Sequence, residues 1–214
     1  MLIGGGFLLL IKLWQLFKAS QKVAVFGTSE SGKTTLWDGL RGRLSANGRY
    51  VSTTQNQEVS EFVFKRSEGH KVKVAKGIDI PGKDEIFESA CNKILNEDHL
   101  IVFFLVSAID LMRGNVHESG ARLGKIKLKL RDCEGCVIIL LITHKRDFIN
   151  SYGEDRISEV VGLAHKHYDK YTDKGYNMLE LTDPADVDKV KDIIGGFVAS
   201  DVVDYFSKWY NVLL

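Results

Sequence analysis

The sequence predicts a three-layer α/β fold, in which helices cover both faces of a doubly wound, mostly parallel six-stranded sheet with one antiparallel strand. Two continuous apolar runs of strand length, 100–106 and 137–142, are typical of central parallel strands buried on both faces. Strand and helix patterns alternate from residue 21 onward, which is the order of a parallel sheet with crossover helices. The runs 59–65 and 71–80 break this order, because the short turn between them makes an antiparallel hairpin.

The other elements follow from the hydrophobic pattern along the chain. A short buried strand is expected at 22–26, and a last strand is expected at 176–181. Helices are expected where apolar residues recur every three or four positions, at 34–44, 85–95, 117–130, 153–168 and 185–210. The polar stretch 45–58 is predicted to be a long loop, and long loops inside compact domains are usually functional.

The composition is that of one folded globular domain. The 214 residues are 44% hydrophobic and 27% charged with only 2 prolines, which excludes a disordered or fibrous chain. The net charge of +1 gives no global field of the kind that marks a nucleic-acid-binding protein, so any phosphate recognition must be local. Cys133 and Cys136 lack a second pair that would complete a zinc site, and we expect two ordinary thiols in a reducing compartment.

Residues 1–20 form an apolar segment ahead of the domain at 21–214. Its uncharged part, 1–11, is about half of the ~20 residues that span a bilayer, and Lys12 falls where the middle of a span would be. The apolar positions with helical spacing are Phe7, Leu10, Ile11, Trp14 and Phe17. They predict an amphipathic helix that contacts a membrane surface or a partner through residues 3–18, at the cytoplasmic face of a membrane. Packing of this helix on its own domain is the alternative.

The turn after the first strand carries the most specific motif. A phosphate-binding P-loop is matched at every specified position by Gly27-Thr28-Ser29-Glu30-Ser31-Gly32-Lys33-Thr34, between a strand and a helix. Its glycines let backbone N–H groups curl around phosphate oxygens, and the helix N-terminus adds the positive end of its dipole. Lys33 places a cation on the outer phosphates, and Thr34 offers its hydroxyl to Mg²⁺. The residues expected to bind nucleotide here are Gly27, Glu30, Ser31, Gly32, Lys33, Thr34 and Thr35.

With this loop and with Asp79-Ile80-Pro81-Gly82 at the end of the hairpin, the chain resembles the small P-loop GTPases. The resemblance implies the P-loop NTPase fold of the small GTPase type, with GTP or GDP and Mg²⁺ as cofactors. It also implies that Asp79 holds Mg²⁺ through water and that the amide of Gly82 touches the γ-phosphate. A carboxylate opposite the P-loop suits a hard cation, and a glycine lets the backbone approach the phosphate closely.

In this family the loop before the second strand is the first switch, where one threonine coordinates Mg²⁺ and senses the γ-phosphate. Thr54 and Thr53 are the candidates, and their spacing does not choose between them. Thr54 is assigned as the metal ligand and, with Lys33, as a catalytic residue. A Ser/Thr-rich loop that makes no such contact is the alternative.

The family recognises guanine with Asn-Lys-x-Asp, or sometimes Thr-Lys-x-Asp, after the fifth strand. Here Lys145 and Asp147 match, and His144 replaces the Asn. The resemblance implies that Asp147 accepts two hydrogen bonds that adenine cannot donate and that the Lys145 stem covers the ring. Without the Asn, its supporting bonds to the P-loop are expected to be lost, with weaker binding or relaxed base choice. Thr182 is the candidate from the last base-contacting loop.

Lys83 follows Gly82 where many small GTPases have a Gln that orients the attacking water. Because positioning and charge stabilisation supply nearly all catalysis in phosphoryl transfer, we expect slow intrinsic hydrolysis unless a partner supplies the missing groups.

Asp-x-Pro-Gly without the Gln, behind an N-terminal apolar segment, is similar to the signal recognition particle receptor β subunit and, more loosely, to the ADP-ribosylation-factor group. The resemblance implies a membrane-associated GTPase switch that contacts protein partners through its switch loops.

Two other functions stay open at this point. A GTP-holding scaffold that recruits a partner and seldom turns over is favoured by Lys83 and His144. A P-loop ATPase or kinase is the third possibility, and Asp147 argues against it because a carboxylate selects guanine.

Overall fold

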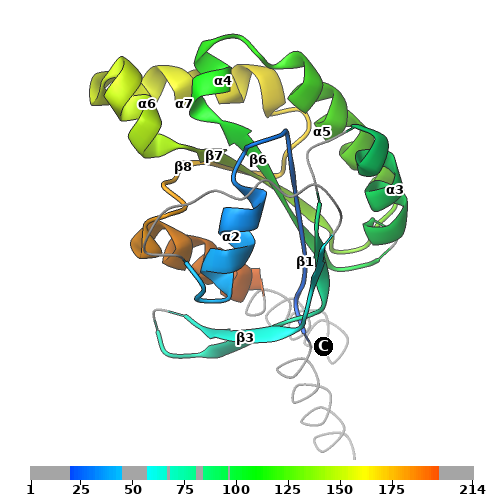
Figure 1. Ribbon diagram of the computed structural model, residues 1–214. Helices are drawn as coiled ribbons and strands as arrows, with labels where there is room; N and C mark the ends of the chain where they lie inside the picture. The colour runs from blue at the N-terminus through cyan, green and yellow to red at the C-terminus, as the bar shows by residue number, and fades with distance from the viewer. Residues whose placement is uncertain (1–19, 45–56, 67, 81–83, 96, 198–214) are drawn as a thin grey trace, which may run out of the picture.

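The computed structural model describes residues 20–44, 57–66, 68–80, 84–95 and 97–197. Six strands form one sheet in the order β2-β5-β1-β6-β7-β8, and helices cover both of its faces (Figure 1). Within this sheet, as the described residues form it, the pairing of β2 (Gln57–Val59) with β5 (Gly77–Asp79) is antiparallel and the other four pairings are parallel. The predicted fold class, a mostly parallel six-stranded sheet with one antiparallel strand, is therefore confirmed.

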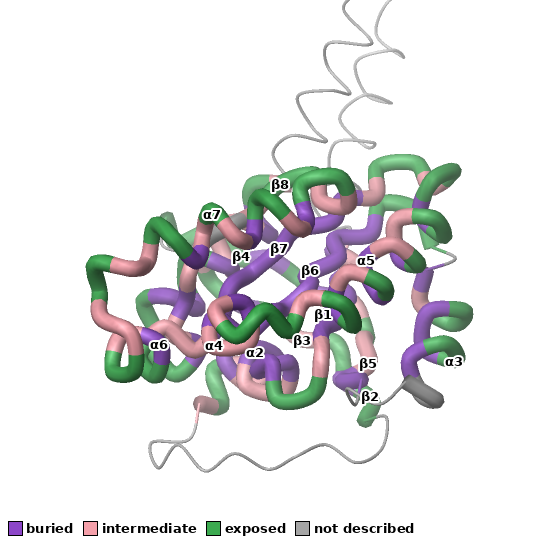
Figure 2. Tube along the Cα trace, turned by 90° about the horizontal axis from the view of Figure 1, so that it is seen from above, coloured by how far each residue is buried: buried purple, intermediate pink, exposed green. Residues whose placement is uncertain are grey.

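Three parallel strands make the buried centre of the sheet. They are β1 (Lys22–Gly27), β6 (Leu100–Ser107) and β7 (Val137–Thr143), and every residue of β6 and β7 is buried. Figure 2 shows this buried track running through the middle of the molecule. The register places Gly27 beside Leu105 and Ser107 beside Thr143, so the carboxyl ends of all three strands reach the same edge. In open α/β sheets this is the edge at which ligands bind.

The helices divide between the two faces of the sheet. On one face lie α3 (Asp84–Ile94), α4 (Ala108–Met112), α5 (His117–Lys129), α6 (Lys145–Tyr152) and α7 (Ile157–Tyr168). On the other face lie α2 (Lys33–Leu40) and a helix that occupies residues 184–197, drawn in blue and orange in Figure 1. Each face has its own apolar cluster, because alternate residues of the central strands point to opposite faces.

The predicted hairpin is divided into two parts. The part farthest from the turn forms β2 and β5 in the main sheet. The part next to the turn forms β3 (Phe62–Lys65) and β4 (Lys71–Val74), a separate antiparallel pair. This separate pair covers α2, with the Phe62 ring centroid 6.4 Å from that of Trp37 in an edge-to-face contact. Apolar burial against α2 thus bends two runs that the sequence shows as continuous.

Several predicted boundaries are corrected. Helix α2 ends at Leu40, four residues before the expected position. Strand β8 (Lys174–Met178) overlaps the predicted strand at 176–181, but it starts two residues earlier and ends three residues earlier. The helix predicted at 153–168 starts as a 3₁₀ turn, Glu154–Arg156, and continues as α7. Helices α4 and α6 have no counterpart in the sequence analysis.

Cys133 and Cys136 form a disulfide, which corrects the expectation of two separate thiols. The turn before β7 brings their Cα atoms to 5.7 Å, within the usual range for a disulfide.

Among the helices of the described residues, none is long and apolar enough to cross a membrane. The amphipathic helix expected through residues 3–18 lies outside the described residues.

Candidate nucleotide-binding site

The turn between β1 and α2 has the backbone geometry of a closed phosphate-binding loop. A Cβ on Gly27 would lie 2.5 Å from the carbonyl oxygen of Leu105, so only glycine fits at the end of β1. Gly32 has a φ of 91° and forms the N-cap of α2, a left-handed conformation that favours glycine. Between them, the hydroxyl of Ser31 donates to the carbonyl of Thr28 at 2.9 Å and closes the loop on itself.

Lys33 lies inside this loop and is only 6% exposed. Its ammonium donates to the carbonyl of Thr28 at 2.5 Å and approaches that of Gly27 at 3.4 Å. Burial lowers the pKa of Lys33 to about 8, although the nearby carboxylate of Asp79 opposes this shift. A desolvated cation surrounded by backbone dipoles is suited to binding an anion such as phosphate.

Thr34 and Asp79 meet beside the lysine. The Thr34 hydroxyl donates to Oδ2 of Asp79 at 2.7 Å, and Asp79 is 3% exposed at the end of β5. A hydroxyl and a carboxylate are the hard oxygen ligands that Mg²⁺ prefers, and Mg²⁺ usually binds through one or two carboxylates while keeping several waters. The Thr34 hydroxyl and the Asp79 carboxylate therefore fit Mg²⁺.

The other residues predicted in this region differ in their surroundings. Glu30 is exposed at the tip of the loop with a φ of 57°, and Thr35 is half-buried in the first turn of α2. Thr53, Thr54 and Gly82, the candidates from the two switch loops, lie outside the described residues.

The predicted base-reading residues open α6, directly beyond β7. His144 is the N-cap of α6 in a left-handed conformation with a φ of 62°. Lys145 and Asp147 fall in the first helical turn, and the Lys145 amide donates to the carbonyl of Leu179 at 3.4 Å. The motif is thus held next to the chain that follows β8, which carries Thr182.

Thr143, the residue before His144, links the end of β7 to the P-loop. Its hydroxyl lies 3.0 Å from the carbonyl oxygen of Ser31 in the P-loop and 3.1 Å from that of Val106. The residue before His144 therefore links the motif to the P-loop, and the expected loss of the Asn's own bonds stays a prediction. Thr143 is a site residue that the motif alone does not predict, although a threonine at the end of a buried strand and beside the motif could have indicated it.

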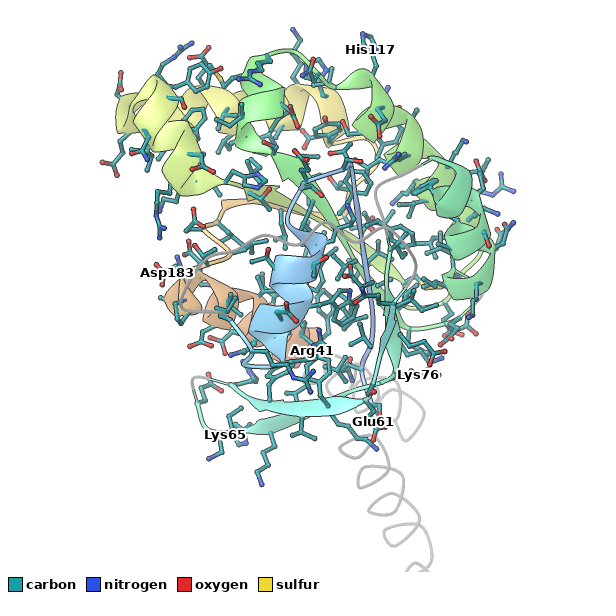
Figure 3. All side chains as sticks on the ribbon, viewed as in Figure 1. Arg41, Glu61, Lys65, Lys76, His117 and Asp183 are labelled. Atoms are coloured by element: carbon teal, nitrogen blue, oxygen red, sulfur yellow. A yellow bond between two sulfur atoms is a disulfide. The ribbon has the colours of Figure 1, made fainter. Side chains whose placement is uncertain are left out.

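Glu180 organises the last loop of the site and was also missed. Its carboxylate accepts hydrogen bonds from the amide of Arg146 at 3.1 Å, the amide of Thr182 at 3.3 Å and the hydroxyl of Thr182 at 2.5 Å. Burial raises the pKa of Glu180, but these hydrogen bonds outweigh it and leave the pKa below its ordinary value. The Thr182 hydroxyl therefore donates its hydrogen bond to Glu180. The label of Asp183 marks this loop in Figure 3.

A third missed residue is Arg122 of α5, the helix that starts at His117 in Figure 3. Its guanidinium donates to the carbonyl of Gly27 at 3.0 Å and pairs with Glu118 at 2.7 Å. The available signal was its place in the apolar stripe of α5, beside Leu123 and Ile126. An arginine in such a stripe is buried, and a buried charge needs partners.

The fold and this site together define a P-loop nucleotide-binding protein of the Ras-like small GTPase type. A family model described as signal recognition particle receptor beta subunit matches residues 18–162. The chain belongs to that family, and its family and structural neighbours support a GTP-binding small GTPase. A search of curated proteins gives no significant match.

Two solved structures share the fold. The Arl6 BBS3 small GTPase from Trypanosoma brucei, with the bound nucleotide analogue GppNp, has a TM-score of 0.57 and 12% identity, over 85% of this chain and 99% of that one. The Methanosarcina barkeri Roco2 RocCORdC structure, bound to GDP, has a TM-score of 0.55 and 15% identity, over 85% of this chain. The present chain spans about half, 49%, of the length of that Roco protein.

Proposed function

We propose that the protein binds GTP and GDP with Mg²⁺ and acts as a membrane-associated switch with slow intrinsic hydrolysis. The observation that carries the proposal is the convergence of Lys33, Thr34 and Asp79 at the carboxyl ends of β1 and β5. Lys33 is buried against the P-loop carbonyls, and Thr34 lies 2.7 Å from Asp79. This arrangement supplies a cation for the phosphates and two oxygen ligands for Mg²⁺.

The same residues divide the work of holding the nucleotide. The backbone of Gly27, Ser31 and Gly32 cradles the phosphates, and Lys33 neutralises the outer ones. Thr34 and Asp79 would hold Mg²⁺, which would neutralise negative charge on the phosphates. Thr54 and Gly82 complete the site from the switch loops as the γ-phosphate arrives.

Guanine recognition rests on the start of α6. Asp147 accepts hydrogen bonds from the guanine edge, Lys145 covers the ring with its stem, and His144 begins the helix that presents both. The support for this role is structural: Thr143 ties the motif to the P-loop, and Glu180 holds the adjacent loop. The start of α6, which binds the base, and the P-loop, which binds the phosphates, are thus connected by a hydrogen bond.

Slow hydrolysis follows from Lys83, which stands where the water-orienting Gln is common. Lys33 and Thr54 stabilise developing charge on the phosphates, but neither orients the attacking water. A partner that binds the switch loops can supply the missing group, since an added arginine can contribute roughly 10³ to 10⁵ in rate. Residues 3–18 bring the domain to a membrane surface at its cytoplasmic face, or to a membrane-bound partner.

The test is binding of fluorescent GTP and ATP, with and without Mg²⁺, to the full chain and to two variants. We expect GTP to bind more tightly with Mg²⁺ than without it, Asp147→Ala to reduce the preference for GTP over ATP, and Lys33→Ala to abolish binding of both. Asp155→Ala is the control, because Asp155 is exposed in the 3₁₀ turn after α6. Tight ATP binding that ignores Asp147 would instead favour an ATPase or kinase.

A GTP-holding scaffold is the second candidate, and Lys83 is the feature that favours it. A switch needs a partner that distinguishes the two nucleotide states, because a ligand with equal affinity for both shifts nothing. Titrating a partner against the GDP form and the GppNp form separates the two functions. Equal affinities, combined with no measurable single-turnover hydrolysis, would establish the scaffold.

A further inference from the structure

Arg122 is a deeply buried arginine that contacts the nucleotide site. The residue is 3% exposed, and a buried guanidinium is costly unless hydrogen bonds and charges compensate for lost water. Its carboxylate partner Glu118 lies on the surface, with a side chain that is 53% exposed. An ion pair with a solvated partner does not by itself require the arginine to point inward. What lies at the buried end of the side chain is therefore informative.

At that end, Arg122 reaches the first residue of the P-loop. Its Nη1 donates to the carbonyl oxygen of Gly27 at 3.0 Å, and the Lys33 ammonium lies 3.4 Å from the same oxygen. A phosphate-binding loop needs its N–H groups directed at the anion, and carbonyl oxygens in the same turn must point elsewhere because they repel phosphate. A guanidinium that captures the Gly27 carbonyl fixes this orientation before the nucleotide arrives.

The same guanidinium also touches α3, the helix that begins two residues after Gly82. Its Cζ lies 5.2 Å from the ring centroid of Phe87, a cation–π distance, and Phe87 is buried in the first turns of α3. The Phe87 ring packs edge-to-face on Phe26 at 5.8 Å, and Phe26 directly precedes Gly27. Arg122 and Phe26 thus join the start of the P-loop to the start of α3.

We propose that Arg122 is a positioning residue of the nucleotide site, which holds the Gly27 carbonyl in place and links the P-loop to α3 through the ring of Phe87. The inference rests on the proposed guanine-nucleotide binding and adds a connection within that site. Nucleotide at the P-loop then changes the packing of α3 through Arg122 even when no γ-phosphate is present for Gly82 to touch.

The positioning role is tested by GDP affinity. Arg122→Gln removes the cation but keeps a polar side chain, and its partner Glu118 is 53% exposed, so water can solvate that carboxylate. Hydrogen bonds to charged groups contribute enough that we expect GDP affinity to fall by about tenfold or more. Arg122→Lys, which keeps one cationic donor but cannot stack on Phe87, is expected to recover part of the loss.

The link to α3 is tested by hydrogen exchange of residues 84–94 with and without GDP. GDP has no γ-phosphate, so a GDP-induced slowing of exchange in α3 reports on the route through the P-loop. We expect this slowing in the wild type and its loss in Phe87→Leu, which keeps an apolar side chain but has no ring face. If Arg122 had only a structural role, Arg122→Gln would lower the unfolding midpoint but would not change the GDP-induced slowing of exchange in α3.

Arg156→Gln is the matched control. Arg156 also pairs with a carboxylate, Glu159, and lies 5.7 Å from a ring centroid, that of Tyr152, but it is half-exposed after α6 and away from the P-loop. Circular dichroism establishes that each variant folds. If Arg122→Gln does not fold, the GDP affinity of Arg122→Lys tests the positioning role and the Phe87→Leu exchange result tests the link.

Wild-type GDP affinity in folded Arg122→Gln would overturn the positioning role, and an unchanged α3 response in Phe87→Leu would overturn the link. Absence of GDP binding by the wild type, in contrast, would refute the proposed function before any variant is compared.

Discussion

The hydroxyl of Thr143 lies 3.0 Å from the carbonyl oxygen of Ser31, so the end of β7 is tied directly to the phosphate-binding loop. The two residues are separated by 112 positions in the chain. The bond places the start of the base-reading motif at a fixed distance from the P-loop. A nucleotide has a fixed length between base and phosphates, and a framework that matches this length before binding loses less entropy when it binds.

The first prediction tests this bond. Thr143→Val keeps the shape of the side chain but leaves the buried Ser31 and Val106 carbonyls without this donor, which costs about 1–3 kcal/mol of stability. We expect the unfolding midpoint in urea to fall and GDP affinity to drop by about tenfold. Thr143→Ser keeps the hydroxyl and should retain most of the affinity. Thr172→Val, which removes a hydroxyl at the end of α7, is the control and should leave nucleotide binding unchanged.

Thr143 also illustrates what the sequence could and could not predict. The P-loop pattern and the apolar runs of β6 and β7 are local signals, and they located the fold and the Gly27–Thr34 turn. A linear motif does not show that Thr143, the residue before His144, reaches the Ser31 carbonyl of the P-loop. Arg122 and Glu180 were missed for the same reason: their roles depend on contacts between distant segments.

The secondary-structure errors have physical causes of the same kind. The separation of β3 from β2 lets the partly buried Phe62 pack against Trp37 of α2 and places Phe64 in the same apolar cluster, and a strand pattern contains no information about that partner. Helix α6 begins at His144 in a left-handed conformation without a side-chain cap, so the usual helix start signal is absent. Helix α4 is only five residues long, too short to show a helical period.

The second prediction concerns Lys33. Burial disfavours its charged form, so replacing the ammonium by an apolar side chain of similar length removes a desolvation cost from the nucleotide-free protein. Lys33→Met is therefore expected to bind no GTP or GDP and yet to unfold at the same or a higher temperature than the wild type. Differential scanning fluorimetry with and without nucleotide measures both effects. A strongly lowered melting temperature without nucleotide would show that Lys33 is needed for the fold itself.

The third prediction uses the lowered pKa of Glu180. A carboxyl whose pKa is lower in the folded state stabilises the fold above its unfolded pKa, and this contribution is lost as pH falls through the folded pKa. Glu180→Gln should therefore destabilise the protein at pH 7 by about 1 kcal/mol, the usual contribution of such hydrogen bonds. The difference from the wild type should shrink as pH falls below 4.5, the ordinary pKa of the group.

Urea unfolding of both proteins at a series of pH values measures this difference. Glu154→Gln, an exposed carboxyl in the 3₁₀ turn, serves as the control and should show a small difference at every pH. The same Glu180→Gln protein should bind GDP more weakly, because the Arg146 amide and Thr182 lose the carboxylate that holds them together. A difference in stability that stays constant down to pH 3 would show that the Glu180 charge does not contribute.

The last prediction separates the three cysteines by their reactivity. Cys91 is fully buried in α3, and burial raises its pKa to about 11, so at pH 8 almost no thiolate is present to react. Cys133 and Cys136 lie in the more open turn before β7 and are expected to react once their disulfide is reduced. After reduction, alkylation of the native protein with iodoacetamide at pH 8 should label these two residues and leave Cys91 unmodified, as read by peptide mass spectrometry. Labelling in urea should add Cys91. Rapid native labelling of Cys91 would mean that α3 opens to solvent, and nucleotide should then slow that reaction if α3 packs more tightly when the P-loop is occupied.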